Sequence, residues 1–237
     1  MDKTHGDLAS GERIIVPLTK EEMIEAARGR IIEIQKEFRA AFELLGKYPK
    51  SVTFFGSARF TENNPHYIAA QNLAKRLSAL GYSIVTGGGP GIMEAANRGA
   101  FENKGQSVGI NIKLPREQMG NLYINDSMEV EYFFVRKVAL SFAAEAYIFF
   151  PGGFGTLDEF FEILTLVQTR KIKHVPLILV GKDYWGALDQ FILEQIYQKH
   201  KAVAPEDMRL YTITDDEDEV LEIVKNTPVV NSLKMHQ

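Results

Sequence analysis

Apolar residues recur at helical spacing in the first part of the chain. Between Lys20 and Lys47 they lie three, four and seven positions apart among charged residues, which predicts one long amphipathic helix. Thr19 is its predicted N-cap, and Glu22 stands three positions later, at the spacing of a capping box. Such a helix must bury its apolar stripe against the domain or against a partner subunit. Residues 1–18 lack periodicity, and we expect a loose arm there.

Beyond residue 50, short apolar runs alternate with stretches of helical periodicity. The runs predict strands at 51–55, 82–86, 107–112, 128–134, 146–150, 175–180 and 210–214. Helices are predicted at 65–80, after Pro90, at 135–143, from the turn after residue 151 to residue 169, at 183–197 and up to Lys225. This alternation predicts an α/β fold with a doubly wound, mostly parallel sheet and helices on both faces. We expect an arm and helix over residues 1–50 and one domain over residues 51–237.

Five consecutive acidic residues, 215–219, precede the last predicted helix. A metal site needs oxygen ligands that converge, whereas contiguous residues on a helix diverge. We therefore interpret the run as the acidic opening of a helix, where the helix dipole favours negative charge.

Composition narrows the class of protein. The net charge of −4 gives no global attraction to nucleic acid or to anionic membranes, so neither is an expected partner. The absence of cysteine excludes disulfides, thiolate metal sites and cysteine nucleophiles. The sequence begins without the apolar core of a signal peptide, and no apolar run reaches the roughly 18 residues that span a bilayer. We therefore expect a cytoplasmic protein.

The apolar run 146–150 leads into a glycine-rich turn. It is short and uncharged, which is typical of a strand buried on both faces of a parallel sheet. Gly152, Gly153 and Gly155 then permit close approach of a ligand, and the N–H groups of the following helix point into the turn. This arrangement favours an anion, most often phosphate. The spacing matches neither a Walker loop nor the usual dinucleotide fingerprint.

Polar side chains follow this turn. Thr156 adds a hydroxyl donor, and Asp158 and Glu159 place carboxylates on the first turn of the helix. A phosphate site with an adjacent carboxylate is a candidate active site. The alternative is an ordinary strand-to-helix turn, with acidic residues that the helix dipole favours without any ligand.

A second small-residue turn, Gly56 and Ser57, follows the first predicted strand. The loop after a first parallel strand commonly lines the ligand crevice of an open α/β sheet. Ser57 is therefore a candidate donor to a ligand, and Arg59 is a candidate phosphate contact. The alternatives are a serine in a tight turn and an exposed arginine.

A third turn contains three successive glycines, among them Gly88 and Gly89, and Glu94 lies in the first turn of the next helix. Each glycine costs about 0.5 to 1 kcal/mol relative to alanine in regular structure, which a ligand would explain. The alternatives are a tight turn capped by Pro90 and simple complementation of the dipole by Glu94.

Arg136 and Lys137 are adjacent cations at the start of an otherwise apolar helix. The helix dipole disfavours cations at that end, so we infer an anionic partner. A salt bridge to a neighbouring acid is the alternative.

Together these stretches resemble the Lonely Guy family. Its signature, PGGxGTxxE, matches residues 151–159, and the family also carries an upstream Arg-Lys helix and a GGG turn, found here at 136–137 and 87–89. The resemblance extends over about residues 50–185. It implies a Rossmann-type homodimer or higher homo-oligomer. It also implies hydrolysis of the N-glycosidic bond of nucleoside 5′-monophosphates, including cytokinin ribotides and AMP, to free base and ribose 5-phosphate.

The resemblance assigns catalysis to Arg136 and Glu159 and the phosphate loop to Gly152, Gly153, Gly155 and Thr156. The other expected ligand contacts are Gly56, Ser57, Gly88, Gly89, Glu94, Lys137 and Asp158. Breaking a ribosidic bond develops positive charge on the sugar, so a carboxylate below C1′ stabilises it and orients water. Glu159 suits this role and Arg136 suits holding the nucleotide, while Asp158 is an alternative acid that could bind the ribose hydroxyls. The scheme requires no metal and no cofactor.

Two other functions compete with this one. A non-catalytic nucleotide-binding or carrier protein on the same fold is the first, because fold alone does not settle function. A dehydrogenase is the second, and it lacks the dinucleotide fingerprint. Older names for similar sequences refer to lysine decarboxylation, a chemistry that no residue pattern here supports.

Overall fold

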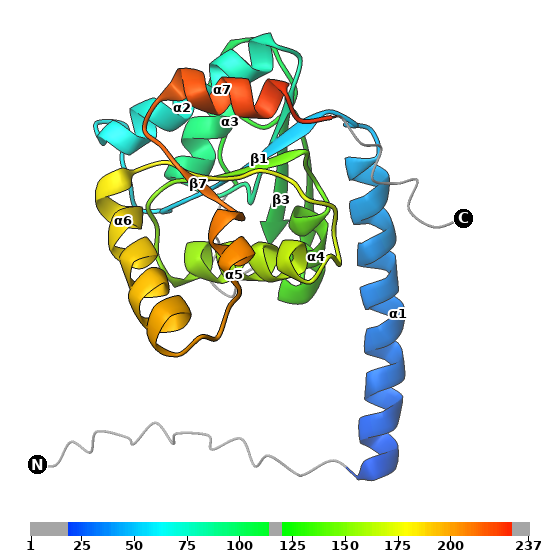
Figure 1. Cartoon of the computed structure of the whole chain (residues 1–237). Helices are drawn as coiled ribbons and strands as arrows, with labels where there is room; N and C mark the ends of the chain where they lie inside the picture. Colours follow the sequence, from blue (N-terminus) through cyan, green and yellow to red (C-terminus); the bar gives the residue numbers. More distant parts are fainter. Residues whose placement is uncertain (1–18, 114–119, 229–237) are drawn as a thin grey trace, which may run out of the picture. The chain divides into compact units, whose positions relative to one another are not determined.

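The computed structural model describes residues 19–113 and 120–228 (Figure 1). The chain divides into two compact units, Met1–Lys36 and Glu37–Gln237. Helix α1, Lys20–Leu45, begins in the first unit and ends in the second. The domain boundary expected at residue 50 therefore stays a prediction.

The start of α1 has the cap that the sequence predicts. The N–H of Glu22 donates to Oγ1 of Thr19 at 3.2 Å, and the N–H of Thr19 donates to Oε2 of Glu22 at 2.8 Å. These reciprocal hydrogen bonds confirm the capping box. The loose arm expected over residues 1–18 lies outside the described residues. Neither α1 nor any other helix in the described ranges is both long and apolar enough to cross a lipid bilayer.

Seven strands form one sheet in the second unit, and every pair of neighbours is parallel. The strands are β1 (Ser51–Phe55), β2 (Ser83–Thr86), β3 (Ser107–Ile112), β4 (Asp126–Val130), β5 (Ala146–Phe149), β6 (Leu177–Leu179) and β7 (Thr212–Ile213). Their order is β4-β3-β2-β1-β5-β6-β7. The chain thus builds outward from β1 to one edge and then from β5 to the other, which confirms the doubly wound fold. The order reverses between β1 and β5, where open sheets of this kind bind ligands.

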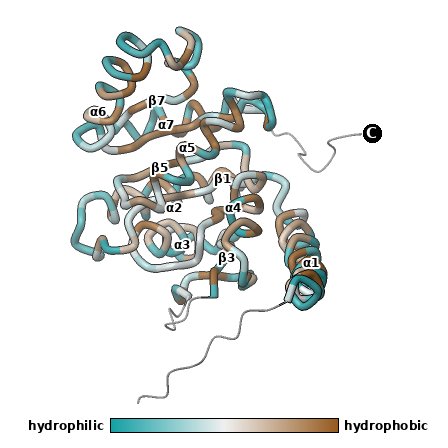
Figure 2. Tube along the Cα trace, turned by 90° about the horizontal axis from the view of Figure 1, so that it is seen from below, coloured by the Kyte–Doolittle hydropathy of each residue, from teal (hydrophilic) through white to brown (hydrophobic). Residues whose placement is uncertain are grey.

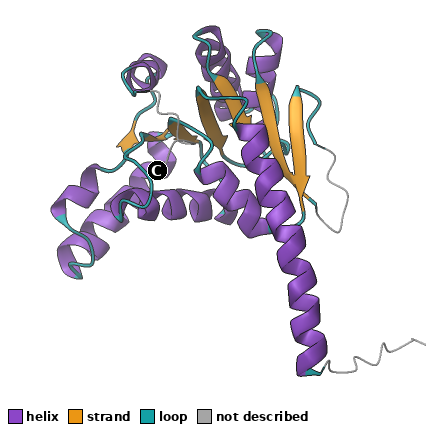
Figure 3. Ribbon diagram, turned by 90° about the vertical axis from the view of Figure 1, so that its right-hand side faces the viewer, coloured by secondary structure: helices purple, strands orange, loops and turns teal. Residues whose placement is uncertain are grey.

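Helices cover both faces of this sheet (Figures 1 and 3). They are α2 (Pro65–Ala79), α3 (Ile92–Glu102), α4 (Phe133–Ser141), α5 (Phe154–Gln168), α6 (Lys182–Phe191) and α7 (Glu217–Lys225), with a π-helical turn at Ile192–Lys199 and a 3-10 turn at Pro205–Arg209. One core joins α2, α3 and α7 to the sheet, and the other joins α4, α5, α6 and the end of α1. In β5, Ile148 belongs to the first core and Phe149 to the second, because successive side chains of a strand point to opposite faces. Hydrophobic and hydrophilic residues alternate along the helices, as one buried face requires (Figure 2).

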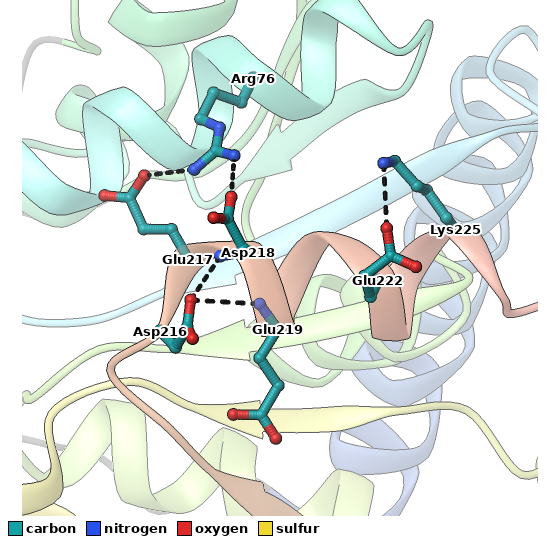
Figure 4. A network of polar contacts seen from close by, with 7 residues as sticks. All are labelled: Arg76, Asp216, Glu217, Asp218, Glu219, Glu222 and Lys225. Atoms are coloured by element: carbon teal, nitrogen blue, oxygen red, sulfur yellow. Dashed lines mark hydrogen bonds and ion pairs between the residues drawn. The ribbon is translucent and has the colours of Figure 1, made fainter.

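Helix α7 opens with the acidic run. Asp216 is its N-cap, and Oδ1 of Asp216 accepts hydrogen bonds from the N–H groups of Asp218 at 2.9 Å and Glu219 at 3.4 Å (Figure 4). Arg76 of α2 pairs with Glu217 at 3.0 Å and also with Asp218. The interpretation as a helix opening is confirmed. Within the residues that the structure describes, no cluster of acidic residues and histidines could hold a metal ion.

The boundary between β4 and α4 differs from the prediction. The sequence predicts a strand up to Phe134 and a helix after it, whereas β4 ends at Val130 and α4 begins at Phe133. Aromatic residues favour strands by propensity, but Phe133 and Phe134 are exposed side chains on the first turn of α4. The strand also begins earlier, at Asp126, because β4 is an edge strand whose partly exposed positions accept polar residues.

The central position of Ile148 generates a test of this core. Its side chain is fully buried, so Ile148→Ala should lower the free energy of unfolding by about 3 to 4 kcal/mol and Ile148→Val by about 1 kcal/mol. Leu122→Ala is the control, because Leu122 is 83% exposed and its truncation should cost less than about 0.5 kcal/mol. Urea denaturation measures all three. Equal losses at positions 148 and 122 would contradict the assignment of Ile148 to the core.

Candidate active site

A cavity of about 850 Å³ opens at the carboxyl ends of β1 and β5. The loop after β1, from Phe55 to Phe60, lines the cavity together with the turn and helix start from Pro151 to Glu159. Gly87, Met93, one face of α4 and Tyr184 complete the lining. The cavity therefore lies where the strand order reverses, at the ligand crevice expected of an open parallel sheet.

Most of the predicted site residues line this cavity. They are Gly56, Ser57, Arg136, Lys137, Gly152, Gly153, Gly155, Thr156, Asp158 and Glu159. Gly88, Gly89 and Glu94 are not among the lining residues. Glu94 instead accepts a hydrogen bond from the Tyr67 hydroxyl of α2 at 2.9 Å. These three residues do not line the cavity, although they adjoin the lining residues Gly87 and Met93 in sequence, and their contact with a substrate stays a prediction.

The three glycines of the turn after β5 have different surroundings. A Cβ on Gly152 would lie 2.1 Å from Oγ1 of Thr156, so the turn itself requires glycine there. A Cβ on Gly153 or Gly155 would meet no heavy atom of the described chain within 4 Å. Neither of these two glycines has a positive φ. Their missing side chains therefore leave open space at the start of α5, where the first N–H groups of a helix lack intrahelical acceptors.

Neighbouring elements hold this turn in place. The N–H of Ser57 donates to the carbonyl oxygen of Pro151 at 3.0 Å. From α6, the Tyr184 hydroxyl donates to the carbonyl oxygen of Gly152 at 2.8 Å. Because the loop after β1 and α6 both bind the turn, its N–H groups are positioned before any ligand arrives.

Arg136 reaches the cavity from α4 and is fixed by two backbone oxygens. Its Nε donates to the carbonyl oxygen of Ile110 at 2.8 Å, and its Nη2 donates to that of Gly87 at 2.9 Å. A Cβ on Gly87 would lie 1.9 Å from Nη2, so this approach requires glycine at position 87. Burial lowers the pKa of Arg136, and the charge of Glu159 opposes the shift. The ordinary pKa of arginine is so high that the guanidinium stays charged at neutral pH.

Glu159 is a buried carboxyl group in the cavity wall. The residue is 9% exposed, and its Oε2 has no hydrogen-bond partner within the described residues. Burial raises the pKa of Glu159 to about 7; the charge of Glu162 adds to the rise, while Lys137 and Arg136 oppose it. A carboxyl group that exchanges its proton near neutral pH inside a cavity is typical of a general acid or base.

Lys137 forms salt bridges with two acids of α5. Its Nζ lies 2.8 Å from Oδ2 of Asp158 and 2.7 Å from Oε2 of Glu162. For Lys137 the sequence left two possible anionic partners, a ligand and a neighbouring acid. The structure shows salt bridges to two neighbouring acids. A direct contact between Lys137 and a substrate stays a prediction.

Several residues that line the cavity were not predicted from the sequence. They are Met93, Phe133, Phe154 and Tyr184. Tyr184 meets Gly152 across 32 positions of sequence, and no local pattern signals such a contact. The sequence could have indicated Phe154, since it occupies the variable position inside the glycine turn. Its side chain is 92% exposed.

The chain has relatives of known name. A model of the family described as "Possible lysine decarboxylase" matches residues 93–224. A "Probable cytokinin riboside 5′-monophosphate phosphoribohydrolase" of Oryza sativa subsp. japonica is 34% identical over 137 residues, which are 56% of this chain and 55% of the relative. The "Pyrimidine/purine nucleotide 5′-monophosphate nucleosidase" of Escherichia coli K12 is 30% identical over 166 residues, 64% of this chain and 36% of the relative. The aligned part thus spans about half the length of the rice protein and about a third of the bacterial one.

Solved structures share the fold. The molybdenum cofactor carrier protein from Chlamydomonas reinhardtii has a TM-score of 0.54 and 20% identity, over 75% of this chain and 98% of that chain. The molybdenum cofactor binding protein from Rippkaea orientalis has a TM-score of 0.54 and 19% identity, over 74% of this chain and 96% of that chain. At these identities the similarity concerns the fold alone, and it agrees with the parallel sheet described above.

The family model covers more than half of the chain and includes Arg136, Lys137 and the signature at 151–159. The rice relative is a phosphoribohydrolase of the kind that the sequence motifs indicate. Motifs, fold and relatives therefore agree, and the chain belongs to the Lonely Guy family, whose model carries the lysine decarboxylase description.

Proposed function

We propose that the protein hydrolyses the N-glycosidic bond of nucleoside 5′-monophosphates, such as AMP or cytokinin ribotides, and releases free base and ribose 5-phosphate. The observation that carries the proposal is Glu159, a buried carboxyl group in the wall of a cavity that also contains a glycine-rich helix start. Both relatives named above are enzymes of nucleotide 5′-monophosphates. In this proposal residues 51–237 form the nucleotide-binding domain.

The phosphate of the substrate would bind at the start of α5. The open space beside Gly153 and Gly155 lets an anion approach the backbone, and the helix dipole favours negative charge there. The hydroxyl groups of Ser57 and Thr156 line the same cavity and can donate to phosphate oxygens. Burying phosphate in a site built from N–H groups also explains how a protein of net charge −4 can hold an anion locally.

Glu159 would act on the sugar. As the C1′–N bond breaks, the departing base takes the electron pair and the sugar becomes positively charged. The Glu159 carboxylate stabilises that charge and takes a proton from the water whose oxygen bonds to C1′. The departing base nitrogen gains a proton in exchange, and release of the proton from Glu159 restores the carboxylate. Within the described residues the Nη1 of Arg136 makes no hydrogen bond, because the carbonyl contacts use Nε and Nη2. This nitrogen is therefore available to hold the nucleotide.

The proposal includes a homodimer or a higher homo-oligomer in the cytoplasm. Phe133 is 58% exposed and Phe154 is 92% exposed, and both line the cavity. Apolar surface of this kind beside a site suits contact with another protein surface, such as a second copy. The acidic net charge supports neither nucleic acid nor a membrane as a partner.

The first test is product chromatography. The purified protein is incubated with AMP, other nucleoside monophosphates and isopentenyladenosine monophosphate, alongside the free nucleosides. We expect free base from monophosphates only. Glu159→Gln should lower turnover by about a hundredfold or more, because it removes the carboxylate but keeps its shape. Nucleotide binding by this variant should survive in calorimetry.

Glu222→Gln on α7 is the matched control, because Glu222 pairs only with Lys225 in the described structure and should retain full turnover. Turnover by Glu159→Gln at the wild-type rate would remove Glu159 from catalysis. Tight nucleotide binding with no product from the wild-type protein would instead favour a non-catalytic carrier on the same fold.

The phosphate loop has its own test. Gly153→Ala should leave the free energy of unfolding within about 0.5 kcal/mol of wild type, because the added Cβ meets nothing and the backbone is extended. It should raise the KM for AMP by about tenfold, since the methyl group occupies the space of the anion. Gly152→Ala should destabilise the protein, because its Cβ would collide with Thr156. An unchanged KM for Gly153→Ala would move the phosphate away from this loop.

The pH dependence follows from the raised pKa of Glu159. The active form is the carboxylate, which predominates above a pKa of about 7. kcat should therefore be constant above that pH and fall tenfold for each pH unit below it. A nucleotide phosphate also titrates near pH 6, so nucleotide binding by Glu159→Gln across the same range is the control. The fall in kcat toward low pH is the acid limb of the profile. An acid limb centred near pH 4.5, the ordinary pKa of glutamate, would contradict the assignment.

A further inference from the structure

A cluster of three carboxylates on α5 surrounds the ammonium group of Lys137. Asp158, Glu159 and Glu162 all belong to the first three turns of this helix. Lys137, from α4, contacts the first and the last of them, at 2.8 and 2.7 Å. Its side chain is 23% exposed and that of Glu162 is 28% exposed, so this ion pair is largely shielded from water. Glu159, the carboxyl group assigned to the reaction, makes no such pair within the described residues.

Glu162 lies beside Glu159. The two residues are three positions apart on one helix, and such positions are neighbours on the helix surface. Two carboxyl groups held close together resist being ionised at the same time. Glu162 is not among the residues that line the cavity, so any influence on the reaction acts through neighbouring side chains and not by contact with the substrate.

Other charged and titratable groups also face Glu159. They are Arg136 and Lys137 of α4, Asp158 of α5 and Tyr147 of β5. Tyr147 is buried, and its hydroxyl donates to the carbonyl oxygen of Ser141, so it carries no charge at neutral pH. Arg136 is fixed by backbone oxygens. Asp158 is 61% exposed, where water screens its charge.

We propose that Glu162 is a positioning residue that controls the proton on Glu159: Lys137 holds its carboxylate next to Glu159, and its negative charge keeps that group from being fully ionised. Glu162 also draws the Lys137 ammonium toward itself, away from exclusive pairing with Glu159. A general base works best when its pKa lies near the working pH. The negative charge of Glu162 moves the pKa of Glu159 toward that pH. The kinetic part of this inference rests on the proposed function.

The sign of the effect follows from the charges. Glu162→Gln removes a negative charge beside Glu159 and leaves Lys137 with Asp158 as its remaining partner. Both changes favour the ionised form of Glu159, so its pKa should fall, by about one unit. Lys137→Met removes a positive charge, so the pKa of Glu159 should rise. Glu162→Asp keeps the charge and should stay close to wild type.

The kinetic experiment compares the pH profiles of kcat for AMP hydrolysis. For Glu162→Gln the acid limb should move about one pH unit lower, whereas Lys137→Met should move it higher. Glu222→Gln should leave it in place. A residue that merely supports the fold would lower activity at every pH without moving the limb. An acid limb that stays at the wild-type pH in both Glu162→Gln and Lys137→Met would overturn the inference.

A second experiment does not need turnover. The full chain is labelled with carbon-13 at the glutamate side-chain carboxyl, and NMR follows each resonance against pH; the resonance missing from Glu159→Gln belongs to Glu159. Its titration midpoint should fall by about one unit in Glu162→Gln. An unchanged midpoint would overturn the inference even in an active enzyme. If no variant releases base, the proposed function fails while the midpoint still decides the role of Glu162. Lys137→Met gives the opposite shift and serves if Glu162→Gln does not fold.

Discussion

Parallel pairing of all seven strands is the constraint on which the site depends. In a parallel sheet every strand ends at the same edge, so loops that are far apart in sequence meet there. The loop after β1 at residue 57 and the turn after β5 at residue 152 thus line one cavity. The reversal of strand order between β1 and β5 keeps helices from filling the space between them. Few of the site's contacts are local, and the sheet supplies the framework for all of them.

Charge in the cavity is divided between two helices. Helix α4 contributes Arg136 and Lys137, and α5 contributes the carboxylates that follow the glycine turn. The two cations have different tasks, because backbone oxygens fix Arg136 whereas acids of α5 fix Lys137. Glu159 feels the charge of both cations, and its Oε2 has no hydrogen-bond partner in the described residues. The site therefore combines Arg136, which backbone oxygens orient, with Lys137, which neutralises two acids of α5. The third charged group is the Glu159 carboxyl, whose raised pKa lets it gain or lose a proton near neutral pH.

The sequence predicted the elements and the turns better than it predicted the direction of side chains. Buried apolar runs and glycine breaks are local signals, and they located the parallel strands and the turn after β5. The predicted β4–α4 boundary was wrong because aromatic residues such as Phe133 favour strands by propensity, whereas Phe133 lies on the exposed first turn of α4. Glu94 and Lys137 carry the expected charge, but packing turns them toward Tyr67 and the acids of α5. Such directions depend on tertiary contacts that no spacing encodes, and the contact between Tyr184 and Gly152 is another example.

The close approach of Arg136 to Gly87 couples two positions that are far apart in the sequence. Because a Cβ at position 87 would lie 1.9 Å from the guanidinium, a larger residue there would displace the end of the Arg136 side chain from the carbonyl oxygen of Gly87. In evolutionary terms we expect the two sites to be epistatic, since a change at one alters the effect of a change at the other. We therefore expect a relative with a side chain at the position of Gly87 to hold its arginine differently or to lack it.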